Sequence, residues 1–281
     1  MNSFGVRVIK KLGWLKSINT TVKKLFNGKP VIIPLINGLG YENLSTSEDW
    51  MYVVLGKLLP LFKGAFIDIG VNVGQTLIKL KTVNRDIEWI GFEPNPKCIY
   101  YSSELIRSND FQNCRLIPVG IFNRDDILEL EFYSDSDTDP SASLIRNFRP
   151  DEKVFERIII PVTTFEKANS LLHLSGVAVI KIDVEGAEPE VLESLQSVIN
   201  QYRPLLMMEI LPCYTSNNDQ RIKRQQSIEA ILFGLSYKIF RIVKLNLREF
   251  VKFESIESIG IHDNLDMCEY VMVPLEIADK I

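Results

Sequence analysis

The sequence predicts a doubly wound, Rossmann-like α/β fold: a mainly parallel seven-stranded sheet that ends in an antiparallel strand pair. The first observation is the stretch AFIDIGVNVGQTLIKL at residues 65–80, where a buried strand, a glycine turn and a helical pattern follow one another. The second is that strand and helix patterns alternate repeatedly after it. The third is that two strand patterns, at residues 237–243 and 269–273, have no long helix between them, which is typical of antiparallel strands.

The composition is that of a globular protein with a substantial core, because 46% of the residues are hydrophobic and 24% are charged. The net charge of −4 argues against a general nucleic-acid binder. No apolar run reaches the length of a spanning helix, and the N-terminus has no secretory pattern. The four cysteines lack C-x-x-C spacing, which disfavours zinc and suits a reducing compartment, so we expect a cytoplasmic protein.

Residues 1–60 are predicted to form a helical and strand extension to a domain that covers residues 61–281. Residues 1–29 contain seven basic residues and no acidic one, and their apolar residues recur at three- and four-residue steps. This periodicity predicts an amphipathic helix or helix pair. Its basic face either makes peripheral contact with an anionic membrane surface or stays in solvent while the apolar face packs on the domain, and the second alternative is favoured. A short strand is expected at 31–35 and a helix at 50–58.

The glycine turn after the first buried strand supplies the first candidate cofactor-binding residues: Asp68, Gly70, Asn72 and Gly74. Asp68 is a carboxylate inside an apolar strand, and such a group needs a partner. The two glycines let the backbone approach a ligand at the start of a helix, whose first N–H groups are free. Because Asn72 replaces the second glycine of the dinucleotide fingerprint, the pattern instead resembles the first motif of methyltransferases that use S-adenosylmethionine (SAM). The alternative is an ordinary glycine turn between a strand and a helix.

The second buried strand, at 88–92, places Glu93 at its carboxyl end within GFEPNP. A carboxylate at this place in a doubly wound sheet accepts hydrogen bonds from both ribose hydroxyls. Alternatively, Glu93 caps the helix that begins near Pro94. The turn at 120–126, which includes Asn123, follows the third strand and by analogy with the fold flanks the adenine.

Residues 127–162 are predicted to leave the main sheet. Two half-exposed strand patterns, at 128–132 and 158–162, enclose a polar segment rich in turn-forming residues. We expect antiparallel strands with a mobile loop over the cleft, or a loop that is only solvated.

Three carboxylates are candidates for catalysis: Asp183 and Glu185, which follow a buried strand, and Glu209, which ends the next one. Open α/β sheets bind ligands at the carboxyl ends of their strands, so the three are expected to lie at the same edge. Lys181 lies inside the strand before Asp183 and needs a partner.

Three segments in this order, FIDIGVNVGQ, GFEPNP and IKIDVEGAEPEVLESL, resemble the FkbM family of methyltransferases. The resemblance covers roughly residues 60–274, with D-x-E-G-x-E as its most specific motif. It implies transfer of the SAM methyl group to an oxygen, typically on a sugar or another small-molecule hydroxyl. Val71 takes the place of the family's alanine, which affects packing more than chemistry. Residues 1–60 lie largely outside the resemblance.

Methyl transfer to an alcohol requires collinear positioning and removal of the hydroxyl proton. The candidate groups are Asp183, Glu185, Glu209 and His262, a histidine in the loop before the last strand. Two or three of the carboxylates could instead hold Mg²⁺ together with the substrate hydroxyl, although the sequence assigns no metal ligand. A structural alternative is that the acidic residues stabilise the start of a helix and that Asp183 pairs with Lys181.

Two other functions compete with methyl transfer. One is a Rossmann-type oxidoreductase that binds NAD or a nucleotide sugar, and Asn72 and the terminal strand pair argue against it. The other is a non-catalytic binding module with the same fold, which the intact acidic set disfavours.

Overall fold

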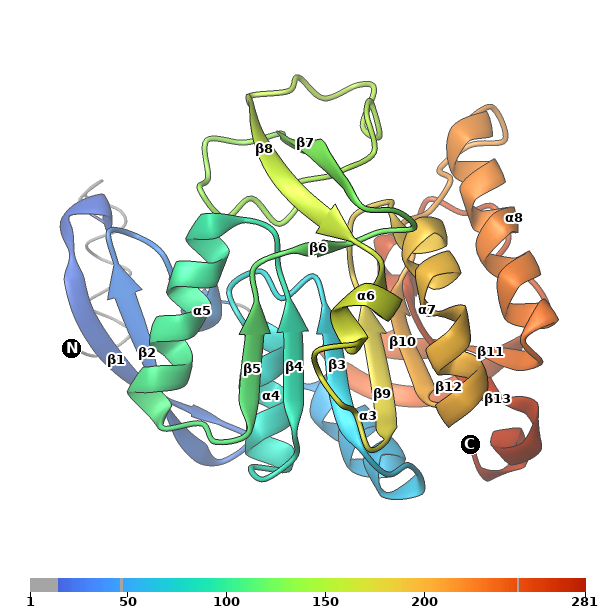
Figure 1. The fold of residues 1–281 in the computed structure, drawn as a ribbon, viewed down its shortest axis with the longest axis horizontal. Coiled ribbons are helices and arrows are strands. Elements are labelled where there is room, and N and C mark those ends of the chain that lie inside the picture. The colour runs from blue at the N-terminus through green and yellow to red at the C-terminus, as the bar shows by residue number, and fades with distance from the viewer. Residues whose placement is uncertain (1–14, 46–47, 247) are drawn as a thin grey trace.

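The computed structural model describes residues 15–45, 48–246 and 248–281, and a mixed β-sheet forms its centre (Figure 1). Within these residues the sheet has eight strands in the order β12-β11-β13-β10-β9-β3-β4-β5. Their bounds are Ala65–Ile69 (β3), Trp89–Phe92 (β4), Cys114–Ile117 (β5), Val177–Ile182 (β9), Leu205–Glu209 (β10), Tyr237–Leu245 (β11), Glu249–Ile256 (β12) and Glu269–Pro274 (β13). Pairing is parallel from β5 to β10, whereas β13 pairs antiparallel with both β10 and β11. The predicted doubly wound fold is confirmed.

The prediction of seven strands was wrong by one, because β12 forms in a stretch expected to be a loop. β12 pairs antiparallel with β11 at the edge of the sheet. Its side chains are exposed or half-buried along EFVKFESI, so no clean alternation of polar and apolar residues marks the strand. Phe250 and Phe253 fix its position by packing against the hydrophobic core.

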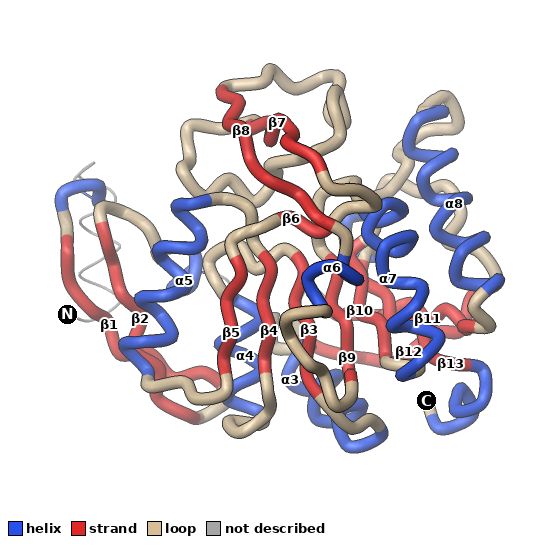
Figure 2. The backbone as a smooth tube through the Cα atoms, viewed as in Figure 1, coloured by secondary structure: helices blue, strands red, loops and turns tan. Residues whose placement is uncertain are grey.

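Helices cover both faces of the sheet (Figures 1 and 2). One face carries α3 (Trp50–Leu58), α4 (Gln75–Val83) and α5 (Pro96–Asn109), and the other carries α6 (Phe165–Asn169), α7 (Glu188–Tyr202) and α8 (Asp219–Gly234). The short helices are α2 (Glu42–Ser45) and the 3₁₀ turns at Leu15–Ser17, Leu59–Leu61, Leu265–Met267 and Leu275–Lys280. In the described ranges, none of the helices is both long and apolar enough to cross a membrane.

The N-terminal segment forms a β-hairpin, so the helix predicted over residues 1–29 is wrong where the structure describes it. Strands β1 (Asn19–Phe26) and β2 (Lys29–Ile36) pair antiparallel, while residues 1–14 lie outside the described residues. The Asn27-Gly28 turn has positive φ at both positions, which suits a two-residue hairpin. Val22 and Phe26 are buried in the core that α4 and α5 share, so the hairpin packs on the domain.

A second, three-stranded sheet lies above the carboxyl ends of the parallel strands (Figure 1). It contains β6 (Gly120–Ile121), β7 (Asp126–Phe132) and β8 (Glu156–Thr163), with β7 and β8 antiparallel as predicted. The long connection between β7 and β8 is mostly irregular (Figure 2) and lies over the same edge of the main sheet. We call residues 133–155 the cover loop.

Candidate active site

A cavity of about 260 Å³ opens between the carboxyl edge of the main sheet and the cover loop. Its walls come from the glycine turn after β3, the ends of β4, β9 and β10, and the start of β13. Asp139 and Leu144 of the cover loop line the opposite side. The cavity therefore occupies the place where open α/β sheets bind ligands.

The glycine turn is shaped by backbone conformations that few residues adopt. Gly70 has a φ of +85°, and a Cβ built on it would lie 1.8 Å from the carbonyl oxygen of Asp183, so no side chain fits there. Asn72 also has a positive φ, and its N–H donates to Oε2 of Glu93 at 2.8 Å. Gly70 and Asn72 line the cavity, whereas Gly74 begins α4 with a left-handed conformation and does not.

Glu93 follows β4 at its carboxyl end and lines the cavity, so its predicted position is confirmed, while its binding of the ribose stays a prediction. Its Oε1 accepts the N–H of Asn95 at 2.8 Å, while Oε2 accepts that of Asn72. Burial raises the pKa of Glu93 to about 7, and the two amide donors oppose that shift. The cap of α5 is Asn95, whose side chain accepts from the N–H of Lys97, so Glu93 is not the capping residue.

Asp68 lies beneath the cavity floor and does not line it. The side chain is fully buried, accepts from the indole N–H of Trp89 at 3.2 Å and lies 3.6 Å from Nζ of Lys181. Burial raises the pKa of this carboxyl, while Lys181 and Trp89 oppose that rise. Asp68 was predicted to bind the cofactor, but it lies outside the cavity, and its neighbour Lys181 is the residue that lines it.

Lys181 connects the glycine turn after β3 to Asp183 of the D-x-E-G-x-E motif. Its ammonium group donates to Oδ2 of Asp183 at 2.9 Å and to the carbonyl oxygen of Gly70 at 3.1 Å. Lys181 and Asp183 both line the cavity, so the predicted pair forms within the site itself. The pair leaves Asp183 facing the cavity with one oxygen held by a cation.

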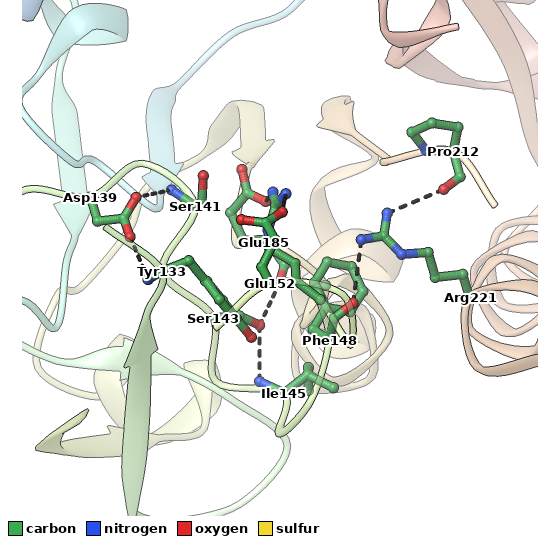
Figure 3. A network of polar contacts seen from close by, with 12 residues as sticks. Tyr133, Asp139, Ser141, Ser143, Ile145, Phe148, Glu152, Glu185, Pro212 and Arg221 are labelled. Carbon is green, nitrogen blue, oxygen red and sulfur yellow. Dashed lines mark hydrogen bonds and ion pairs between the residues drawn. The ribbon is translucent and has the colours of Figure 1, made fainter. Parts of the chain in front are cut away.

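The D-x-E-G-x-E motif divides its carboxylates among three tasks. Glu185 has a left-handed backbone and binds the cover loop, accepting from Nη2 of Arg149 at 2.7 Å. Its carbonyl oxygen accepts from the Ser143 hydroxyl at 2.6 Å, within the polar network of Figure 3. Burial and the Asp183 charge raise the pKa of Glu185 to about 8, although Arg149 opposes the shift. Glu188 is the first residue of α7, and its Oε1 accepts the N–H of Gly186 at 2.9 Å, which holds the turn before the helix.

Glu209 ends β10 beside Glu269 of β13, the residue opposite it in the strand ladder. Both carboxylates line the cavity. Burial, together with the charges of Asp183 and Glu185, raises the pKa of Glu209 well above its ordinary value. Among the described residues the side chain of Glu209 has no hydrogen-bond or ion-pair partner, whereas that of Glu269 pairs with Lys244.

Besides Asp68 and Gly74, two further predicted site residues lie outside the cavity. Asn123 is exposed, and its side chain donates to Oε2 of Glu193 on α7 at 2.8 Å, so its prediction as a cofactor ligand was wrong. His262 also does not line the cavity, and its Nε2 lies 3.4 Å from the hydroxyl of Tyr270, which does. His262 is thus one residue removed from the site, and the prediction that it is the base is not supported by its position.

Sequence reasoning missed several residues that line the cavity. They include Glu48 and Trp50 near the N-terminus and Glu269 and Tyr270 near the C-terminus. Neither pair carries a motif, although the position of Glu269 opposite Glu209 follows once the last strand is paired with β10. Asp139 was hidden in a polar loop, where it accepts N–H groups of Tyr133, Ser134 and Ser141. All three donors belong to the cover loop, so these contacts hold its first part in a compact turn; Figure 3 shows those of Tyr133 and Ser141.

The lining suits an adenosyl sulfonium better than a metal ion. Ile121, Leu130 and Leu144 provide an apolar surface beside Glu93, while the remainder of the cavity is rich in carboxylates. An apolar surface matches a nucleobase, and carboxylates match a sulfonium and an ammonium. Among the described residues, no group of three or more His, Cys, Asp or Glu side chains is placed to hold a metal. The alternative in which two or three of the carboxylates hold Mg²⁺ thus finds no support among the described residues.

The chain was compared with known proteins. The model of the methyltransferase FkbM domain matches residues 68–238. No curated protein matches the chain.

Solved structures of methyltransferases resemble the chain at low identity. The chain is similar to the methyltransferase FkbM from Methylobacillus flagellatus KT, at 14% identity and a TM-score of 0.45, over 75% of this chain and 43% of that one. It thus spans less than half of that relative. It is also similar to precorrin-6y C5,15-methyltransferase from Geobacter metallireducens GS-15 (12% identity, TM-score 0.40, 79% of this chain and 86% of that one). A third similar structure is fibrillarin from Aeropyrum pernix in complex with SAM, at 12% identity and a TM-score of 0.43, over 90% of this chain and 81% of that one.

At these identities the likeness between structures concerns the fold alone. The family follows from the domain model, because that model covers more than half of the chain and includes the glycine turn, Glu93 and the D-x-E-G-x-E motif. The chain belongs to the FkbM methyltransferase family and is a SAM-dependent methyltransferase.

Proposed function

We propose that the protein transfers the methyl group of SAM to a hydroxyl oxygen of a small molecule, with a sugar or glycoconjugate as the favoured acceptor class. The observation that carries this proposal is the set of carboxylates at the ends of β9 and β10, which share one cavity with Glu93. An alcohol must lose a proton as it is methylated, and a carboxylate at the reacting oxygen accepts it. Carboxylates also accept hydrogen bonds from the other hydroxyls of a sugar.

The residues divide the cavity into a cofactor end and an acceptor end. Glu93 accepts the ribose hydroxyls, and the Gly70–Asn72 turn contacts the neighbouring part of SAM. SAM supplies an electrophilic methyl group on a positively charged sulfur. Asp183 and Glu209 lie two and three strands away from β4 in the sheet, so they face the acceptor. Lys181 fixes the orientation of Asp183 through their 2.9 Å contact.

Calorimetric titration tests the cofactor half of the proposal. We expect SAM and S-adenosylhomocysteine to bind and NAD not to bind. Glu93→Gln removes a charged acceptor of ribose hydrogen bonds and should weaken SAM binding by about 1–3 kcal/mol. Asn123→Ala is the matched control, because Asn123 lies outside the cavity, and its SAM affinity should stay within about twofold of wild type, well under the effect of one charged hydrogen bond. Micromolar affinity for NAD without affinity for SAM would refute the proposal.

A further inference from the structure

Among the described residues, seven carboxylates line the cavity, and they differ in what holds them. They are Glu48, Glu93, Asp139, Asp183, Glu185, Glu209 and Glu269. Four form ion pairs within the protein: Glu48 with Lys79, Asp183 with Lys181, Glu185 with Arg149, and Glu269 with Lys244. Glu93 and Asp139 accept backbone N–H groups instead. In the part of the chain that the structure describes, Glu209 is left without a partner.

A half-buried carboxylate without a donor is unfavourable, because it has lost water and gained no hydrogen bond. The other six carboxylates avoid this cost with protein groups. A ligand that brings a hydroxyl into the cavity would supply the missing donor to Glu209. The unpartnered state therefore points to a group that meets the substrate and not to one that stabilises the fold.

The place of Glu209 in the sheet agrees with a role at the acceptor. In the strand order, β10 lies three strands from β4, which carries Glu93 at its end. The ribose end and Glu209 thus lie on opposite sides of the β3 and β9 ends, where Gly70 and Asp183 meet the cavity. Asp183 is less suited to take a proton, because Lys181 holds one of its oxygens at 2.9 Å.

We propose that the Glu209 carboxylate is the general base that accepts the proton of the acceptor hydroxyl, which assigns a catalytic residue to the function proposed above and rests on it. The acceptor oxygen forms a bond to the methyl carbon as the bond from carbon to sulfur breaks. That bonding pair stays on sulfur, which becomes neutral. The hydroxyl proton moves to Glu209, and the resulting carboxylic acid then releases it to solvent.

The charged groups around Glu209 strengthen it as a base. Asp183 and Glu185 approach from the β9 side and Glu269 from β13, while Lys181 contributes the opposing positive charge. Three neighbouring carboxylates favour the protonated product of the transfer more than one paired ammonium disfavours it. Burial is the largest cause of the raised pKa of Glu209, and the neighbouring carboxylates add to it, while no cation forms an ion pair with its side chain among the described residues.

The experiment uses the full chain, tritiated SAM and a panel of neutral methyl glycosides and inositols as acceptors. Glu209→Gln keeps the shape of the side chain and mimics its protonated form. We expect kcat on a panel member that wild type methylates to fall by about 10²–10⁴, with KM changed far less. SAM affinity by calorimetry and the melting temperature should stay close to wild type.

Two further variants separate a loss of the base from a loss of structure. Glu209→Ala should regain part of its activity when formate is added, because formate can occupy the vacated space and accept the proton. Glu269→Gln is the matched control: it removes a carboxylate from the same wall but leaves Lys244 unpaired, so it should lower the melting temperature more than it lowers kcat.

Each outcome decides something. Unchanged kcat in Glu209→Gln would overturn the assignment, since a residue that works as the neutral acid is no base. A parallel loss of SAM affinity or folding would overturn it as well, because the residue would then hold the cofactor or the fold. If wild type binds SAM but methylates no panel member, the proposed acceptor class fails and the base assignment falls with it.

Discussion

At the scale of single residues, the site depends on how buried charges are matched. Lys181 contacts Asp183, the carbonyl of Gly70 and, at 3.6 Å, the fully buried Asp68. Burial lowers the proton affinity of an amine, but these carboxylates more than offset that effect, and the pKa of Lys181 is raised. The ammonium group therefore stays charged and holds the turn after β3 against the end of β9.

Asp183→Asn should lower stability and activity together. The amide keeps the shape of the side chain but removes one of the two carboxylates that balance Lys181. We expect a loss of about 1–3 kcal/mol in the free energy of unfolding by urea denaturation, limited because Asp68 remains, and a fall in methyl transfer. Asp137→Asn serves as control, because its contact with Lys97 at 4.0 Å is exposed and should contribute less than about 1 kcal/mol. A variant as stable as wild type would show that Lys181 does not depend on Asp183.

The site residues that belong to sequence motifs were predicted, whereas those that reach the cavity only through strand pairing, such as Glu269, were missed. Asp183, Glu185 and Glu209 were predictable because each lies at or just after the end of a buried strand, and strand ends meet at one edge. The unpartnered state of Glu209 was not predictable, because it depends on where Lys244 and Arg149 direct their side chains. Asp68 was expected at the cofactor, but its neighbours across the sheet, Trp89 and Lys181, hold it below the cavity.

At the scale of elements, the cover loop is attached to the cavity at both of its ends. Near its start, the side chains of Asn72 and Asn95 donate to the carbonyls of Thr138 and Asp137 at 3.3 and 2.9 Å. Near its end, Arg149 binds Glu185, while Arg221 of α8 donates to the carbonyl of Phe148 and lies 4.2 Å from its ring (Figure 3). The loop is therefore tied to the glycine turn and to the D-x-E-G-x-E motif.

Arg149→Met should release the C-terminal end of the cover loop while leaving the domain folded. The substitution removes the ion pair with the largely buried Glu185, so the loop opens more often and proteases gain access to it. Limited proteolysis followed by mass spectrometry should show faster cleavage within residues 133–155. The rate should rise about tenfold if the free energy that favours the closed loop falls by about 1.4 kcal/mol. Arg146→Met is the control on the same loop, because its pair with Glu129 is exposed and should leave the cleavage rate unchanged. Equal rates in both variants would contradict a latch at Arg149.

The strand predicted at 31–35 is confirmed as β2, but its pairing with β1 in a hairpin and the edge strand β12 escaped sequence prediction for local reasons. The β1–β2 hairpin has apolar residues at steps that also fit a helix, and the Asn27-Gly28 turn was the signal that distinguishes the two. β12 lies at an exposed edge, where no buried face imposes a pattern on the sequence. The central strands and their helices were predictable because continuous burial and capping residues mark both.

At the scale of the whole molecule, the sheet brings many carboxylates to one edge. Their burial lowers the free energy of unfolding when they are charged. Burial raises the pKa of Glu93 and Glu188 to about 7 and that of Glu185 to about 8. An acid whose folded pKa exceeds its unfolded pKa binds more protons when folded. Stability is then lost as the pH rises from the unfolded value near 4.5 through 7 and 8.

The protein without ligand should therefore unfold at a higher temperature near pH 5.5 than near pH 8. Carboxyls with lowered pKa act in the other direction only at lower pH, as with Glu276, whose pKa is lowered to about 2 by Arg203. Differential scanning fluorimetry across this range measures the effect, and Glu185→Gln with Glu188→Gln should flatten the slope. A melting temperature that rises steadily from pH 5.5 to 8 would contradict the assignment of these groups as buried and raised.

The walls of the cavity come from distant parts of the chain, and this fixes when the site can exist during synthesis. Glu48 and Trp50 are made early, and Trp50 donates its N–H to the carbonyl of Arg248 at 2.6 Å, while Glu269 and Tyr270 belong to the last strand. Chains fold as they leave the ribosome, beginning with what has emerged. The cofactor half of the site can form once β4 and β9 are out, but the acceptor half waits for β13. During synthesis, the proposed binding place for SAM can thus form before the proposed binding place for the acceptor molecule.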